Sequence, residues 1–184
     1  KGILLLFDEV QCGMGRTGTL FAWQNYGVMP DALSLAKALG NGYPIAAVVA
    51  QRKLENVLTP GTHASTFGGT PLACAAACAV IDTLTEGGVL ENCRKMGEYL
   101  LKRLMELKAK YSCIQDVRGK GLMLGVVLDF PAAELLGPLR EKGFLALSAG
   151  ETVLRLVPPL IITEKDCDQA VSCIDAALAE YTRK

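Results

Sequence analysis

The stretch Ile3-Leu4-Leu5-Leu6-Phe7-Asp8 decides the fold, because an unbroken run of large apolar residues ends there on a carboxylate. A run without polar alternation is typical of a strand that is buried on both faces, and such strands occur in the middle of parallel sheets. Further short apolar segments follow at 32–35 and 45–50, and a short amphipathic helix is expected around 21–26. Strands that alternate with short helices predict an α/β fold with a mostly parallel sheet.

The apolar run begins almost at the first residue, and the sequence has no initiator Met. A strand from the middle of a sheet needs a neighbouring strand on each side, and an unpaired strand edge invites association with another chain. We therefore expect the sequence to be a fragment of a longer protein.

The second half of the chain has the pattern of a small α+β domain. Gly87-Gly88 separates the two patterns, so we expect one domain over 1–87 and a second over 88–184. The last helix should begin at Thr163, which forms a capping box with Asp166. Before it, helices are expected at about 71–85, 90–110 and 132–142, and strands at 114–117, 122–128 and 154–157.

Composition narrows the class of function. Nineteen Lys and Arg residues balance nineteen Asp and Glu residues, so the protein has no broad electrostatic field for nucleic acid or anionic lipid. No run reaches the roughly 18 apolar residues of a membrane span. Seven cysteines beside a single histidine predict reduced thiols in a cytoplasmic protein, without a metal site. Cys74 and Cys78 are expected to be small buried residues on one helix face.

Lys37 and Asp8 are candidates for chemistry because each follows a short apolar segment. The carboxyl ends of strands form the edge where α/β sheets bind ligands, and a lysine shielded from water there can act as an amine nucleophile. A carboxylate at the same edge can accept a hydrogen bond from the protonated ring nitrogen of a pyridoxal cofactor. Taken singly, Lys37 also fits a solvated turn lysine, and Asp8 also fits a turn cap.

Three other segments are open to more than one interpretation. The glycines of 13–18 do not form a phosphate loop, because the P-loop pattern and a following helix of useful length are both missing. Thr66 lies in a loop before the helix that begins near Pro71, where it suits either a phosphate dianion or an ordinary capping turn. Arg155 stands between two leucines of a strand, facing either solvent or a cavity that holds a carboxylate.

Taken in order, several motifs resemble the class III aminotransferases, most closely the acetylornithine aminotransferases. The resemblance covers essentially the whole chain. The motifs are Leu5-Leu6-Phe7-Asp8-Glu9-Val10-Gln11, Gly13-Met14-Gly15-Arg16-Thr17-Gly18, Leu35-Ala36-Lys37-Ala38-Leu39-Gly40, Ser65-Thr66-Phe67-Gly68-Gly69, Val117-Arg118-Gly119, and Arg155-Leu156 followed by Pro158-Pro159-Leu160.

The resemblance implies a fold-type I enzyme that depends on pyridoxal 5'-phosphate. Residues 1–87 would be the last part of its large cofactor-binding domain and 88–184 its small domain. Lys37 would form the Schiff base with the cofactor and shuttle a proton, and Asp8 would hold the pyridine nitrogen protonated. By the same resemblance Gln11 would contact the phenolic oxygen, Thr66 would reach the phosphate of the cofactor bound mainly by the neighbouring subunit, and Arg155 would hold the substrate α-carboxylate.

The implied reaction moves an amino group from N-acetylornithine to 2-oxoglutarate, in arginine biosynthesis, in a homodimer with shared active sites. Thr70 stands where the family more often has Asn. The upstream half of the large domain, which would hold much of the cofactor, is missing, so we expect these 184 residues alone to be inactive. Ornithine or 4-aminobutyrate specificity remains an alternative, as does a non-catalytic folding or association module.

Overall fold

The computed structural model describes residues 2–183. They divide into two compact units, with the division after Leu90, and each unit is described by itself. The boundary expected at Gly87-Gly88 lies at the end of α1 (Pro71–Glu86), and the units divide in the first turn of α2 (Val89–Lys110). The assignment of 1–87 and 88–184 to the two domains of a larger enzyme stays a prediction.

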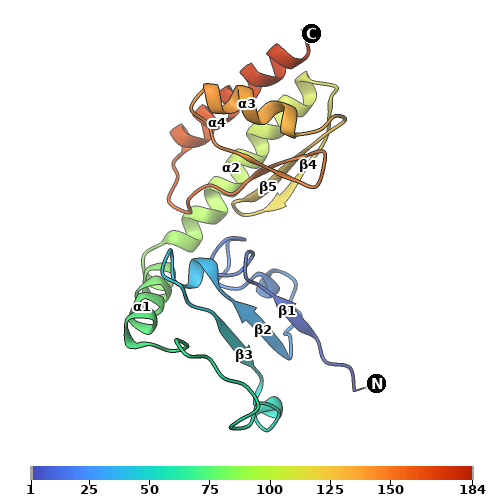
Figure 1. Ribbon diagram of the computed structural model, residues 1–184. Coiled ribbons are helices and arrows are strands. Elements are labelled where there is room, and N and C mark those ends of the chain that lie inside the picture. The colour runs from blue at the N-terminus through green and yellow to red at the C-terminus, as the bar shows by residue number, and fades with distance from the viewer. Residues whose placement is uncertain (1, 184) are drawn as a thin grey trace. The chain divides into compact units, whose positions relative to one another are not determined.

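The first unit is built on a three-stranded sheet (Figure 1). Its strands, in spatial order, are β1 (Leu6–Asp8), β2 (Ala32–Leu35) and β3 (Ala47–Ala50). β1 and β2 are parallel, whereas β3 pairs with β2 in the antiparallel direction, so the sheet within this chain is mixed. Three 3-10 helices complete the unit with α1: η1 (Ala22–Asn25), η2 (Lys37–Leu39) and η3 (Arg52–Leu54).

The prediction that Ile3–Phe7 forms a strand buried on both faces is wrong for this chain. The strand extends only over Leu6–Asp8, and Ile3 and Leu6 are 81% and 67% exposed. Within the described residues β1 is an edge strand that pairs with β2 alone. Burial of such a run depends on what packs on the two faces of the sheet, which the run itself does not specify.

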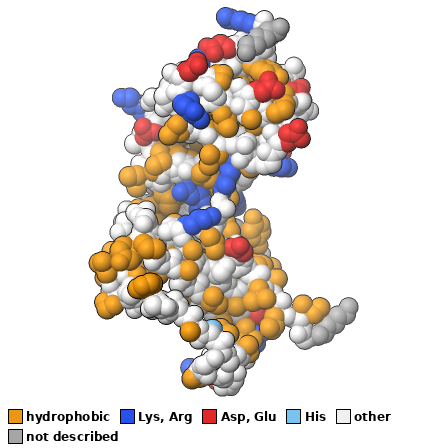
Figure 2. Space-filling model, viewed as in Figure 1, with side chains coloured by type: hydrophobic (Ala, Val, Ile, Leu, Met, Phe, Trp, Pro, Cys, Tyr) orange, Lys and Arg blue, Asp and Glu red, His pale blue; other side chains and the backbone are white. Residues whose placement is uncertain are grey.

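The buried face of α1 passes through Ala73, Ala77 and Leu84, and η2 packs against this helix. Cys74 and Cys78 are exposed, so the prediction that they are buried is wrong. Each follows a buried alanine by one residue, which turns its side chain by about 100° around the helix axis. Figure 2 shows hydrophobic side chains gathered on the surface over α1, in keeping with exposed residues such as Leu72.

The second unit is an antiparallel four-stranded sheet with helices packed on one face (Figure 1). The strand order is β4-β5-β7-β6. The expected strands and helices of this half are confirmed with shifted ends, and one additional short strand, β6, precedes a glycine with positive φ. The elements are β4 (Ile114–Lys120), β5 (Met123–Leu128), β6 (Leu147–Ala149), β7 (Val153–Leu156), α3 (Ala133–Glu141) and α4 (Glu164–Tyr181).

Helix α4 begins at the predicted capping box. The Thr163 amide donates to Asp166 Oδ2 at 2.8 Å, and the Asp166 amide donates to Thr163 Oγ1 at 3.4 Å. These reciprocal bonds satisfy backbone donors that have no partner within the helix. The cap fixes the residue at which α4 begins and therefore which of its residues face the core. Cys167, Ile174 and Leu178 are fully buried.

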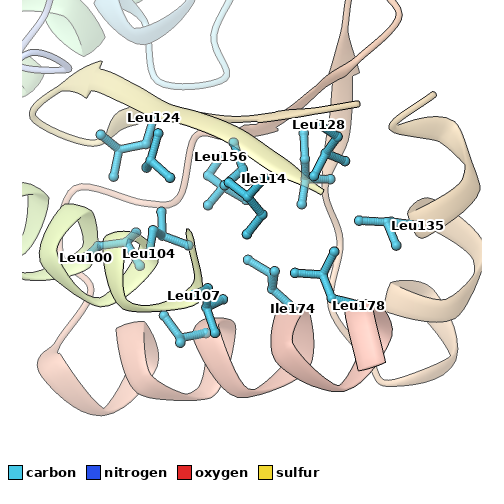
Figure 3. Close-up of a cluster of buried hydrophobic side chains, with 14 of the residues drawn as sticks. Leu100, Leu104, Leu107, Ile114, Leu124, Leu128, Leu135, Leu156, Ile174 and Leu178 are labelled. Carbon is cyan, nitrogen blue, oxygen red and sulfur yellow. The ribbon is translucent and has the colours of Figure 1, made fainter. Parts of the chain in front are cut away.

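Leucine and isoleucine side chains from the sheet and the helices of this unit interdigitate in one core (Figure 3). Helix α2 contributes Leu100, Leu104 and Leu107, α4 contributes Ile174 and Leu178, and the sheet contributes Ile114, Leu124, Leu128 and Leu156. The alternation along β7 puts Leu154 and Leu156 in the core and leaves Val153 and Arg155 on the other side of the strand.

The backbone of α2 approaches the β4–β5 turn closely at Gly97. A Cβ atom at Gly97 would lie 2.4 Å from the Gly121 carbonyl oxygen and 2.7 Å from the Gly121 Cα atom. Only a residue without a side chain fits there, because both groups in contact are backbone atoms that cannot rotate away.

We expect Gly97→Ala to destabilise the second unit despite the better helix propensity of alanine. Overpacking of this kind costs about 1–3 kcal/mol. Urea unfolding followed by circular dichroism measures the loss. The matched control is Glu98→Ala, the next and exposed residue of α2, which should change stability by less than about 0.5 kcal/mol. Equal stabilities for the two variants would contradict the close approach.

Candidate functional site

The carboxyl ends of β1 and β2 bring two of the predicted site residues to one edge of the first sheet. The strands are parallel, and Asp8, the last residue of β1, lies opposite Ser34 of β2. β2 ends at Leu35, and Lys37 follows two residues later. Asp8 and Lys37 therefore lie at the same sheet edge, on adjacent strands.

Lys37 has a backbone conformation that is rare for a residue with a side chain. Its φ is 48°, in the left-handed region, directly after the extended Ala36. The Lys37 carbonyl accepts hydrogen bonds from the amides of Gly40 at 3.1 Å and Asn41 at 3.2 Å, which hold this turn. A non-glycine residue in this region costs of the order of 1–3 kcal/mol, and such residues cluster at functional sites. The side chain itself is exposed.

The Asp8 carboxylate is held in place by one of its two oxygen atoms. Oδ1 accepts from the Val10 amide at 3.0 Å and from the Ser34 hydroxyl at 3.5 Å. Within residues 2–183 no hydrogen bond to Oδ2 is present, and the side chain is exposed. An oriented carboxylate with one open oxygen can accept a charge-assisted hydrogen bond from a cationic N–H group.

Glu9 is a buried carboxylate that the sequence did not single out. It is 2% exposed, and its two oxygens accept from the Ala22 amide at 2.7 Å and the Trp23 amide at 2.8 Å. These bonds satisfy the first turn of η1 and fix the glycine-containing loop between β1 and that helix. Alternation along a strand sends adjacent side chains to opposite sides, so Asp8 faces outward while Glu9 faces inward.

Gln11 and Thr66 lie in two different loops of the first unit. Gln11 is exposed in the turn directly after β1. Thr66 is exposed in the loop before α1, where the N-cap residue Thr70 makes no side-chain capping bond and Pro71 occupies the first turn. Both side chains are thus presented by loops and not by the sheet.

Arg155 belongs to the second unit, in the middle of β7. It is half-buried and lies opposite Gly125 of β5 and Leu147 of β6. Arg155 and Leu147 line a cavity of about 620 Å³, whose other lining residues are mostly apolar. The role of Arg155 in holding a carboxylate stays a prediction.

Asp31 connects three parts of the first unit just before β2. Its Oδ2 accepts from the Leu5 amide at 2.7 Å, and its Oδ1 forms an ion pair with Lys53. The pKa of Asp31 is lowered below its ordinary value of 3.8. The largest cause is the hydrogen bond from the Lys53 side chain, and the next is the hydrogen bond from the Leu5 amide. This carboxylate thereby ties the start of β1 and the segment after β3 to the strand that leads to Lys37.

Among residues 2–183 no three His, Cys, Asp or Glu side chains gather so that they could hold a metal ion. No single described helix is long and apolar enough to cross a membrane, and α1 and α2 reach that length and hydropathy only when taken together across the break between them.

The sequence matches the family model described as Aminotransferase class-III over residues 1–178. An acetylornithine aminotransferase of Methanocaldococcus jannaschii is 46% identical over 183 residues, which are 100% of this chain and 46% of that protein. The corresponding protein of Caldanaerobacter subterraneus is 48% identical over 97% of this chain and 45% of its own length. The chain belongs to the class III aminotransferase family, and it spans about half the length of these relatives.

Solved structures agree with this assignment. N-acetylornithine aminotransferase from Stenotrophomonas maltophilia superposes with a TM-score of 0.87 at 38% identity, over 98% of this chain and 48% of that one. Ornithine δ-aminotransferase from Plasmodium falciparum superposes with a TM-score of 0.91 at 36% identity, over 97% of this chain and 47% of that one. The predicted fold class is confirmed, since these neighbours are pyridoxal-phosphate-dependent aminotransferases of fold type I.

We expect the stabilising effect of Asp31 to depend on pH. Its pKa is lowered in the folded protein, so its contribution is present above the ordinary value of 3.8 and is lost as pH falls through the lower folded-state pKa. The difference in unfolding free energy between the wild type and Asp31→Asn, measured in urea, should be constant near neutral pH and shrink towards zero in acid. A difference that does not change with pH would contradict the ion pair.

Proposed function

We propose that this chain is the C-terminal half of a pyridoxal-phosphate-dependent aminotransferase that moves an amino group from N-acetylornithine to 2-oxoglutarate. The observation that carries the proposal is the placement of Lys37 and Asp8 at one edge of adjacent parallel strands, in a member of the class III family. In this proposal residues 1–87 are part of the large cofactor-binding domain, and residues 88–184 form the small domain.

The residues at the sheet edge fit the cofactor. The open Oδ2 atom of Asp8 suits a protonated pyridine nitrogen, and the exposed amine of Lys37 suits covalent attachment of an aldehyde. When bound, pyridoxal phosphate withdraws electrons from the α-carbon of the amino acid. Side chains of the protein supply the other proposed functions of the site.

Lys37 has two tasks in the proposed reaction. Its Nζ atom would hold the cofactor in the resting enzyme, and as a free amine it would shuttle a proton between the substrate α-carbon and the cofactor. The hydrogen-bonded turn after β2 supports both tasks, because it fixes the backbone from which the side chain starts.

Asp8 keeps the proton on the pyridine nitrogen. Its Oδ1 atom is occupied by the Val10 amide and the Ser34 hydroxyl, which orient the carboxylate before the cofactor arrives. A carboxylate that is already oriented needs no rearrangement when charge develops on the ring.

Three further residues have proposed roles. Gln11 contacts the phenolic oxygen of the cofactor, and Thr66 reaches the phosphate of the cofactor bound mainly by the partner subunit of a homodimer. Arg155 holds the α-carboxylate of the substrate, with a planar guanidinium that matches a carboxylate in two parallel hydrogen bonds. The half-buried position of Arg155 beside an apolar cavity supports this role.

The names of the relatives support the acetylornithine reaction, and we propose with it a role in arginine biosynthesis in the cytoplasm. Those that are 46% and 48% identical are named acetylornithine aminotransferases. We propose this substrate ahead of ornithine, although solved ornithine aminotransferases share the fold at 36% identity. The 184 residues alone bind the cofactor poorly in this proposal, because they span only about half the length of these relatives.

The first test is covalent labelling of Lys37. The complete polypeptide with pyridoxal phosphate, reduced by borohydride and mapped by mass spectrometry, should carry the label on Lys37 alone. Lys37→Ala should abolish both label and transamination. The control is Lys102→Ala, an exposed lysine of α2, which should keep both.

Transamination by the same complete polypeptide distinguishes the possible amino donors. Acetylornithine, ornithine and 4-aminobutyrate are compared as amino donors with 2-oxoglutarate, and acetylornithine should have the highest kcat/KM. Scattered labelling without turnover would refute the proposed function. Transamination by the 184-residue chain alone would instead refute only its proposed inactivity.

The second test concerns the charge of Asp8. Asp8→Asn keeps an oxygen that can accept from the Val10 amide but removes the negative charge. We expect kcat of the complete enzyme to fall roughly 10- to 150-fold, the value of one hydrogen bond to a charged group. Ser34→Ala is the control. It removes only the longer hydrogen bond, at 3.5 Å, from the Ser34 hydroxyl to Asp8 Oδ1, and it should lower kcat much less. Equal losses in both variants would contradict the role of the charge.

A further inference from the structure

The loop between β1 and η1 is built on Glu9. Its buried carboxylate accepts from the amides of Ala22 and Trp23 at 2.7 and 2.8 Å. Its carbonyl oxygen accepts from the Gly13 amide at 3.0 Å, which closes a turn over residues 10–12. Glu9 thus joins the beginning of the loop through its backbone and the end of the loop through its side chain.

The residues that follow the turn pack closely on Glu9. A Cβ atom at Gly13 would lie 2.8 Å from the Glu9 carbonyl oxygen and 3.0 Å from its Oε2 atom. The next residue, Met14, is buried and has a φ of 52°, in the left-handed region. A residue with a side chain keeps that conformation only where its surroundings hold it. The loop therefore has one defined conformation, which Glu9 supports.

Gln11 lies in the middle of the turn that Glu9 closes. Strand β1 ends at Asp8, and the Glu9 amide donates to the Ser34 carbonyl at 3.0 Å. This bond holds the backbone at the end of the strand without using the Glu9 side chain. Beyond the bond, the turn sets the position of the Gln11 backbone. A change in the Glu9 carboxylate can therefore move Gln11 while Asp8 stays in the sheet.

We infer that Glu9 is a positioning residue, which acts on the cofactor site through Gln11. This inference rests on the proposed function for the contact of Gln11 with the phenolic oxygen of pyridoxal phosphate. The buried carboxylate fixes the loop, and the turn presents the amide group of Gln11. An N–H group in that place stabilises negative charge on the phenolic oxygen.

The first measurement needs no cofactor. In the complete polypeptide, hydrogen exchange followed by mass spectrometry reports on the amides of 11–13 and 22–23. Glu9→Gln keeps the shape but turns one accepting oxygen into an NH2 group that faces a backbone N–H. Exchange in both segments should become about tenfold faster or more, the value of one hydrogen bond to a charged group. The matched control is Glu86→Gln, an exposed residue at the end of α1, which should exchange as the wild type does.

The second measurement follows the absorbance of bound pyridoxal phosphate against pH. Loss of a hydrogen bond to an anionic oxygen raises the pH at which that oxygen gives up its proton. Gln11→Ala should therefore raise the pH midpoint by about 0.5 to 1 unit, the value of one hydrogen bond. Glu9→Gln should raise it as well, and the double variant should go no further than Gln11→Ala alone.

Ala22→Pro tests the same contact from the other side if Glu9→Gln fails to fold. Proline suits the first residue of a helix, and the extended Phe21 suits the position before proline. The substitution removes only the N–H group that Glu9 Oε2 accepts. It should raise the pH midpoint in the same direction as Gln11→Ala.

Each other outcome overturns the inference. Additive shifts in the double variant would show that Glu9 does not act through Gln11. A lowered Tm with an unmoved pH midpoint would assign Glu9 a purely structural role. A wild type that does not bind the cofactor would overturn the inference together with the proposed function. A wild type that binds it without transamination would refute the proposed function alone, because both measurements would still score the role of Glu9.

Discussion

The parallel pairing of β1 with β2 is the constraint on which the rest of the candidate site depends. Its register sets Asp8 outward beside Ser34 and leaves Glu9 to the interior. A slip of one residue would exchange these two carboxylates, since the side-chain period of a strand is two. Both would then be misplaced, with Asp8 turned to the other face of the sheet and Glu9 withdrawn from the η1 amides.

Polar contacts at the other end of the strands oppose that slip. The Leu5 amide bonds to Asp31, and Gln51 donates from its backbone to the Asp31 carbonyl at 2.9 Å and from its side chain to the Pro30 carbonyl at 2.8 Å. These bonds join the residues before β1, before β2 and after β3. The left-handed conformation of Lys37 is held by the hydrogen bonds that its carbonyl accepts from the Gly40 and Asn41 amides.

Much of this arrangement could be predicted from local sequence, and the predictions that were wrong or missing have physical reasons. The positions of Asp8 and Lys37 after apolar segments, and the Thr163 capping box, are local signals that the structure reproduces. Burial of Cys74 could not be predicted, because an alanine-rich helix offers several apolar faces of similar quality. The exposure of Ile3 depends on what packs over the segment before β1, which the apolar run does not specify. The buried role of Glu9 depends on amides that are 13 and 14 residues away in sequence.

The two units differ in how completely they bury their apolar residues. In the second unit the core side chains Leu104, Leu135 and Ile174 are fully buried, so the sheet that holds Arg155 is fixed by its own packing. The first unit leaves Ile3 and Phe67 each 81% exposed, on segments adjoining β1 and Thr66. Because a preorganised site requires a packed surrounding shell, the expected weak cofactor binding of this chain is a property of the first unit. The carboxylate recognition proposed for Arg155 would have its supporting core already in place.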